Sequence, residues 1–79
     1  MNRDDTVQES QFARDFPNVH NWVSGRGWIE LGASGQVRSF ARALDEGGMV
    51  WEGRRKYDTI EDALSEMDKG IAQWLGEQS

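Results

Sequence analysis

The clearest pattern of apolar and polar positions lies in the last third of the chain and predicts an amphipathic helix. Its apolar residues recur at three- and four-residue spacing, which places them on one side of a helix: Ile60, Ala63, Leu64, Met67, Ile71, Trp74 and Leu75. Thr59 suits the N-cap, and Glu61 and Asp62 place negative charge in the first turn, where the helix dipole favours it. Gly76 is the expected stop, and Gly70, inside the stripe, predicts the close approach of another backbone.

Two regions in the middle of the chain alternate between bulky and small or polar residues and predict β-strands. The first region covers residues 28–31, with glycines on either side. Ile29 and Leu31 fall on one face of this strand, because successive side chains point to opposite sides. Trp28 and Glu30 fall on the other face.

The second region is centred on the adjacent glycines of the sequence DEGGMVWEG and predicts a β-hairpin. With residues 46–47 as a two-residue loop, Arg42 faces Trp51 and Phe40 faces Gly53. An aromatic ring can lie over a cross-strand glycine and cover its bare backbone, so the second pair is structurally favourable. A four-residue loop gives the same register.

This register sorts the hairpin side chains onto two faces. One face carries Phe40, Leu44, Met49 and Trp51, and the other carries Val37, Ala41, Ala43, Val50 and Glu52. Because the first face is bulkier, we expect it to pack against the helix and the second face to stay open with Trp28. Arg42 is the misfit on the bulky face. Either its guanidinium extends past Trp51 at the edge of the core, or the strand contains a bulge.

Together these elements predict an α+β fold with two layers in the order β-β-β-α. A three-stranded antiparallel sheet carries one C-terminal amphipathic helix on one face, and residues 17–79 form this single domain. Residues 1–16 lack sustained periodicity and predict a mobile N-terminal arm. In one alternative, the apolar residues of this arm dock as a short helix. In another, the arm and Trp22 together fold back and bury the open face.

Composition narrows the chemistry that this domain can perform. A chain of 79 residues fills one small core, and the absence of cysteine excludes disulfides, thiolate metal sites and a cysteine nucleophile. No apolar run approaches the roughly 18 residues of a membrane span, and the polar start is unlike a signal peptide. We therefore expect a soluble cytoplasmic protein that does not associate with membranes.

No constellation of residues in the sequence predicts an enzyme. His20 is the single histidine and has no serine or carboxylate at a spacing that would identify it as a base. Four carboxylates share the polar side of the C-terminal helix, but no histidine or cysteine completes a metal-ligand set: Glu61, Asp62, Glu66 and Asp68. The glycines form neither GxGxxG nor a Walker loop. We expect no catalytic residue, cofactor, metal or small-molecule substrate.

Charge is unevenly distributed along this acidic chain, whose net charge is -5. Residues 26–56 hold six basic and four acidic groups, which gives +2, whereas residues 57–79 hold one basic and six acidic groups, which gives -5. The basic groups cluster on or near the predicted strands: Arg38, Arg42, Arg54, Arg55 and Lys56. With Trp28 as a stacking surface, this patch is typical of a site for RNA or DNA, although the acidic helix opposes long-range attraction.

Two resemblances follow from the residues placed above. The stretches GWIELG, SFARALDEGGMVWEG and YDTIEDALSEMDKGIAQWL resemble a small bacterial family of unknown function that is common in cyanobacteria. More loosely, DEGGMVWEG followed by TIEDALSEMDKGIAQWL is similar to the N-terminal domain of HicB-type antitoxins. The second resemblance implies a β-β-β-α layer related to the double-stranded-RNA-binding fold. The chain lacks the proline- and glycine-rich loop of the HicB pattern.

The function that these observations favour is a non-enzymatic protein-interaction module that acts through the open sheet face or a sheet edge. Its partner would be another protein or a second copy in a homodimer, because excess aromatic residues and free sheet edges both invite a partner. The candidate partner-binding residues are Trp28, Val50, Arg38, Arg42, Arg54, Arg55 and Lys56. The alternative function is an RNA- or DNA-binding module that uses the five basic residues of that set.

Overall fold

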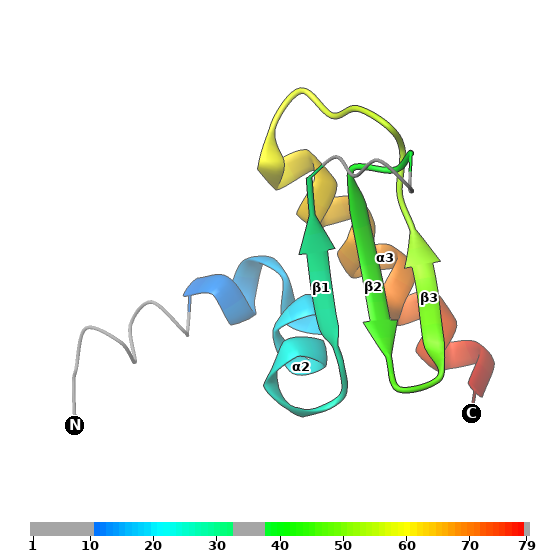
Figure 1. The fold of residues 1–79 in the computed structure, drawn as a ribbon. Coiled ribbons are helices and arrows are strands. Elements are labelled where there is room, and N and C mark those ends of the chain that lie inside the picture. Colours follow the sequence, from blue (N-terminus) through cyan, green and yellow to red (C-terminus); the bar gives the residue numbers. More distant parts are fainter. Residues whose placement is uncertain (1–10, 33–37, 79) are drawn as a thin grey trace.

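A computed structural model describes residues 11–32 and 38–78 and has an α+β architecture. Its elements are α2 (Pro17–Gly25), β1 (Trp28–Leu31), β2 (Ala41–Asp45), β3 (Gly48–Glu52) and α3 (Ile60–Gln78). The strands form an antiparallel sheet in the order β1-β2-β3, and both helices contact it from one side (Figure 1). The predicted fold class, a three-stranded antiparallel sheet with a C-terminal helix on one face, is confirmed.

Helix α2 is an element that the β-β-β-α prediction left out. Pro17 begins the helix, because its fixed φ suits the first turn and its missing N–H would be unpaired there in any case. The helix buries the side chains of Val19 and Trp22, which lie three residues apart. Phe16 precedes it with non-helical backbone angles and makes no side-chain cap.

The missing cap of α2 comes from α3, about 50 residues further along the chain. The backbone N–H groups of Asn18 and Val19 donate to Asp68 Oδ1 at 2.7 and 2.9 Å, and Asn18 Nδ2 donates to Asp68 Oδ2 at 3.0 Å. A carboxylate at this end is favoured both by the unpaired N–H groups and by the helix dipole. A local sequence pattern cannot reveal a cap that only the tertiary fold supplies.

The residues before α2 form a further short helical stretch. Residues 11–15 are helical, and Phe12 and Phe16 pack against the buried core with their rings 5.5 Å apart. Of the arm predicted over residues 1–16, residues 1–10 lie outside the described residues. In the described part of the chain, no helix is both long enough and apolar enough to cross a membrane.

The hairpin has the predicted turn but a different register beyond it. Asp45 pairs with Gly48 and Leu44 with Met49, as a loop at residues 46–47 requires. A bulge then shifts the register, so that Ala43 and not Arg42 lies opposite Trp51. The shift between these pairs leaves one extra residue, Val50, in β3, as in a β-bulge. The second explanation for the misplaced Arg42, a bulge, is therefore correct.

The face assignment of β2 was wrong as a result. Ala41 and Ala43, predicted for the open face, are fully buried beneath the helices. The bulk in this core comes instead from the helices, whose largest fully buried side chains are Trp22, Met67, Ile71 and Val19. Small residues on the central strand let α3 approach it closely, so the bulkier side of the hairpin is not the buried one.

Trp51 fills the space between β3 and α3, as predicted, but its neighbours differ from those expected. A Cβ atom on Gly70 would overlap the Trp51 indole, so this glycine makes room for a side chain and not for a second backbone. Gly53 lies beside Trp51 and the hydroxyl of Tyr57, and its N–H donates to Ala41 O at 2.8 Å, so the predicted pairing with Phe40 was wrong.

Helix α3 agrees with its predicted start but not with its predicted end. Asp62 N–H donates to Thr59 Oγ1 at 3.0 Å, which confirms the N-cap. The helix passes through Gly76 and continues to Gln78. Its stripe is buried at Ala63, Met67 and Ile71, whereas Ile60 at the first turn stays exposed.

Candidate functional site

The candidate site is the side of the sheet opposite the helices, which we call the open face. Residues that lie directly opposite in antiparallel strands share a face. The strand pairings therefore place six residues on it: Trp28, Glu30, Arg42, Leu44, Met49 and Glu52. Among the described residues, no helix packs against this side of the sheet (Figure 1).

Three of these residues form an apolar row across all three strands, near the hairpin turn. Leu44 on the central strand pairs with Trp28 on one side and with Met49 on the other. Trp28 and Met49 each keep 45% of their surface exposed, and Leu44 between them is partly exposed. The row is therefore a continuous apolar strip that the described residues do not cover.

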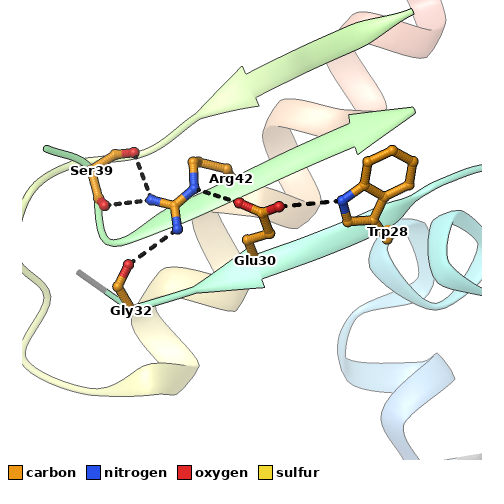
Figure 2. A network of polar contacts seen from close by, with 5 residues as sticks. All are labelled: Trp28, Glu30, Gly32, Ser39 and Arg42. Carbon is orange, nitrogen blue, oxygen red and sulfur yellow. Dashed lines mark hydrogen bonds and ion pairs between the residues drawn. The ribbon is translucent and has the colours of Figure 1, made fainter. Parts of the chain in front are cut away.

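The other three residues form a charged row that runs parallel to the apolar row. Arg42, in the centre, pairs with Glu30 of β1 and Glu52 of β3. Its Nε donates to Glu30 Oε1 at 3.1 Å in an ion pair. Glu30 Oε2 in turn accepts from Trp28 Nε1 at 3.4 Å, a long and therefore weak hydrogen bond that joins the two rows (Figure 2).

Arg42 is buried, with 4% of its surface exposed, although it lies on the open face. Its guanidinium lies at the end of the sheet, where Nη1 donates to Ser39 O at 2.6 Å and Nη2 donates to Gly32 O at 3.1 Å (Figure 2). A buried guanidinium is tolerable only when its N–H groups are paired in this way. Arg42 is thus a structural anchor that holds Glu30 in place and is not free to bind a polyanion.

Arg54, a second member of the predicted basic patch, is also engaged within the chain. Its Nη2 lies 2.7 Å from Glu66 Oε2, and its guanidinium lies over the ring of Tyr57, 4.9 Å from the centroid. The hydrogen bond that Arg54 donates to Glu66 raises the pKa of the Arg54 guanidinium. Tyr57 donates its own hydroxyl proton to Glu66 at 3.0 Å, which ties the loop before α3 to that helix.

The structure does not assemble the predicted partner-binding residues into one surface. Trp28 lies on the open face as expected, whereas Val50, at the bulge, packs against the buried core. Three members of the predicted basic patch are exposed, namely Arg38, Arg55 and Lys56. The other two, Arg42 and Arg54, form ion pairs with glutamates of the same chain. The prediction that Leu44 and Met49 lie in the core is wrong, and the signal that they belong outside is the charged Arg42, which falls on the same face of β2 as Leu44.

The acidic residues of α3 and His20 are the remaining candidates for metal binding or catalysis. The described residues contain no group of three His, Cys, Asp or Glu side chains placed to hold a metal ion. Two of the four α3 carboxylates on the predicted polar side make contacts that stabilise the fold, since Glu66 binds Arg54 and Tyr57 while Asp68 caps α2. The ring of His20 lies beside that of Phe12, with 6.3 Å between centroids.

An open groove of about 230 Å³ lies on the helical side of the molecule and is separate from the open face. Its lining residues are Asn21, Trp22, Arg26 and Leu75. Arg26 lies over both Trp22 and Trp74, 5.7 and 5.6 Å from the ring centroids. The guanidinium therefore covers the edge of the core at the end of α2.

Comparisons of the chain with protein-family models, with curated proteins and with solved structures each found no match.

Proposed function

We propose that this protein is a non-enzymatic protein-interaction module that binds its partner through the open face of its sheet. The observation that carries the proposal is the apolar row, in which Trp28 and Met49 remain exposed on either side of Leu44. Tryptophan and methionine are enriched at protein interfaces, and a contiguous exposed apolar strip is a usual mark of one. The absence of cysteine from the chain is compatible with a reducing compartment such as the cytoplasm.

The position of the row on a rigid sheet supports the proposal further. Arg42 ties the ends of β1 and β2 together through Glu30, Gly32 and Ser39, so the surface is held in one shape before a partner arrives. Binding then orders few side chains, and less of the interaction free energy is lost as conformational entropy. Aromatic anchors on such a surface commonly contribute most of the binding energy.

A protein partner is favoured over nucleic acid by the state of the basic residues. Of the five basic residues in the predicted patch, Arg42 is buried and Arg54 is paired with Glu66. The three remaining basic residues belong to a chain whose net charge is -5, and this negative charge repels a polyanion. Attraction to a polyanion depends on several free cations on one surface, so this arrangement gives it little support.

The test is affinity capture from the native host with three forms of the protein, each with and without nuclease. The double variant Trp28→Ala/Met49→Ala removes the two exposed side chains of the apolar row, and Val23→Ala is the matched control because Val23 is similarly exposed, at 43%, but lies on α2. We expect a protein partner that is retained by wild type and by the control, is unaffected by nuclease, and is lost from the double variant.

Two results would contradict the proposal. Retention of the same partners by the double variant would show that the open face is not used. Loss of every partner on nuclease treatment would favour the nucleic-acid alternative. Light scattering on wild type and on the double variant tells a second copy from a different protein, because only a homodimer changes mass on loss of the row.

A further inference from the structure

We propose that the partner of the open face is a different protein that presents one or two apolar side chains flanked by lysine or arginine. This inference rests on the proposed function and adds the chemistry of the partner. It follows from the charges that border the apolar row, from the state of the cation within that border, and from the exposed tryptophan.

Acidic side chains border the apolar row on both sides along the strands. Glu46 lies in the hairpin turn, next to the end of the row formed by Leu44 and Met49, and is exposed. Glu30 and Glu52 lie in the charged row, on the opposite side of the strip, and are also exposed. A segment that lies across the strip therefore meets carboxylates at both of its flanks.

The basic residue within this border does not present its charge to a partner. Arg42 is almost fully buried, and its guanidinium already donates to Glu30, Ser39 and Gly32. The three glutamates and Arg42 give the surface a net charge of -2. No ion pair in the described part of the chain involves Glu46 or Glu52, so both carboxylates are available. The surface therefore favours a partner that carries positive charge.

Trp28 supplies a second reason to expect a basic partner. A cation is attracted to the face of an exposed indole, and the alkyl stem of lysine or arginine packs on apolar surface beside it. The chain uses the same chemistry internally, because Arg54 lies over the ring of Tyr57 while pairing with Glu66. On the open face, Trp28 and Glu30 offer the ring and the carboxylate, joined by their hydrogen bond.

The dimensions of the row set the size of the apolar part. Trp28 and Met49 are two strand spacings apart, which is about 10 Å. One or two apolar side chains fill this width, and the carboxylates begin about 7 Å away along the strand direction. A second copy of this chain docking by the same face would oppose like charges, so a different protein is the better occupant.

The experiment is a selection from a displayed library of random 12-residue peptides. Wild-type protein is the bait, and the Trp28→Ala/Met49→Ala variant is the counter-bait. The recovered peptides are synthesised and their Kd values are measured by calorimetry against wild type and three single variants. Glu46→Gln and Glu52→Gln each remove one bordering charge, and Glu61→Gln removes an exposed charge from the first turn of α3 as the matched control.

We expect the recovered peptides to carry lysine or arginine next to aromatic or aliphatic residues. Each bordering variant should weaken binding by about two- to fivefold, the range for exposed ion pairs, and Glu61→Gln should leave Kd unchanged. Higher salt should weaken binding to wild type more than to the bordering variants. Thermal melts of all variants check that each remains folded.

The outcomes separate this inference from the proposed function. Peptides that need the apolar row but show no enrichment in basic residues, or that bind Glu46→Gln and Glu52→Gln as well as wild type, would overturn the inference and leave the proposed function standing. Recovery of no peptide that distinguishes wild type from the double variant would overturn both. Concentration-dependent dimerisation that the row variants abolish would identify a second copy as the occupant and would overturn the inference alone.

Discussion

The two faces of the sheet obtain their bulky side chains from different elements. On the covered face, the central strand contributes only Ala41 and Ala43, and α2 and α3 bring the large side chains to it. On the open face, the strands themselves carry the large side chains, and Trp28 and Met49 stay exposed. Bulk on a strand is therefore no guide to burial when helices provide the core.

Charge separates the two faces just as clearly. Beneath the helices, the cluster of buried side chains is entirely apolar. The open face instead contains a buried arginine in an ion pair with a half-exposed glutamate, Glu30. Together with the hydrogen bonds from Arg42 to Ser39 and Gly32, this pair fixes the relative positions of β1 and β2 at this end of the sheet.

The largest expected difference is between two tryptophans, one on each side of the sheet. Trp22→Ala removes a side chain that is 1% exposed and that donates from Nε1 to Leu44 O at 3.0 Å, so we expect a loss of about 3–5 kcal/mol in the free energy of unfolding. Trp28→Ala should cost about 0.5 kcal/mol or less. Urea unfolding followed by circular dichroism measures both, and equal losses would end the distinction between the faces.

Arg42→Met tests the one part of the open face that we expect to contribute strongly to stability. The substitution leaves the carbonyls of Ser39 and Gly32 without their donor, and we expect a loss of about 2–3 kcal/mol in the free energy of unfolding. Glu52→Gln, in the same row, should change it by about 0.5 kcal/mol at most. A stable Arg42→Met variant would show that the guanidinium is not an anchor.

Gly70→Ala tests the packing on the covered face, because its effect on stability should change sign when Trp51 is replaced by a smaller residue. Alanine favours a helix over glycine by about 1 kcal/mol, but its Cβ would overlap the Trp51 indole, and we expect a net loss of about 1–2 kcal/mol. In a Trp51→Leu background the overlap is gone, and the same substitution should stabilise by about 0.5–1 kcal/mol. The double-mutant cycle is read by thermal or urea unfolding. Stabilisation in both backgrounds would contradict the packing described for Trp51.

Asp68→Asn gives the smallest effect and addresses how α2 is held. The variant loses the carboxylate that accepts hydrogen bonds from the first N–H groups of α2. We expect a loss of about 1 kcal/mol in the free energy of unfolding. Hydrogen exchange should accelerate most at the amides of Asn18 and Val19. Unchanged exchange at these two amides would show that α2 is capped by other means.

Much of this fold could be predicted from local pattern, because α3 and β1 each carry their own signals. The apolar stripe and the Thr59 cap located the start of α3, and the alternation around Ile29 gave both the strand and its faces. Helix α2 carries one local signal, Pro17 at its first position, but no local cap, since its cap is Asp68 of α3. A local pattern cannot contain a partner that lies 50 residues away.

The site was harder to predict because a single residue reverses a face. The bulge at Val50 turned the expected register by one position, so that the expected core residues Leu44 and Met49 became surface and the expected surface residues Ala41 and Ala43 became core. Side chains alternate along a strand with a period of two, and one inserted residue is enough to exchange the faces. Trp28 was placed correctly because β1 has no bulge.

The most direct test of the account is a nuclear magnetic resonance titration of the ¹⁵N-labelled protein with the tightest peptide from the selection. The chain has four tryptophans, and each gives its own indole N–H signal. We predict that the Trp28 signal moves on binding, together with the backbone signals of Leu44, Met49 and Glu52, while the signal of Trp74, which packs against the core from α3, stays in place. Movement of the Trp74 signal with Trp28 unchanged would contradict the claim that the open face is the binding surface.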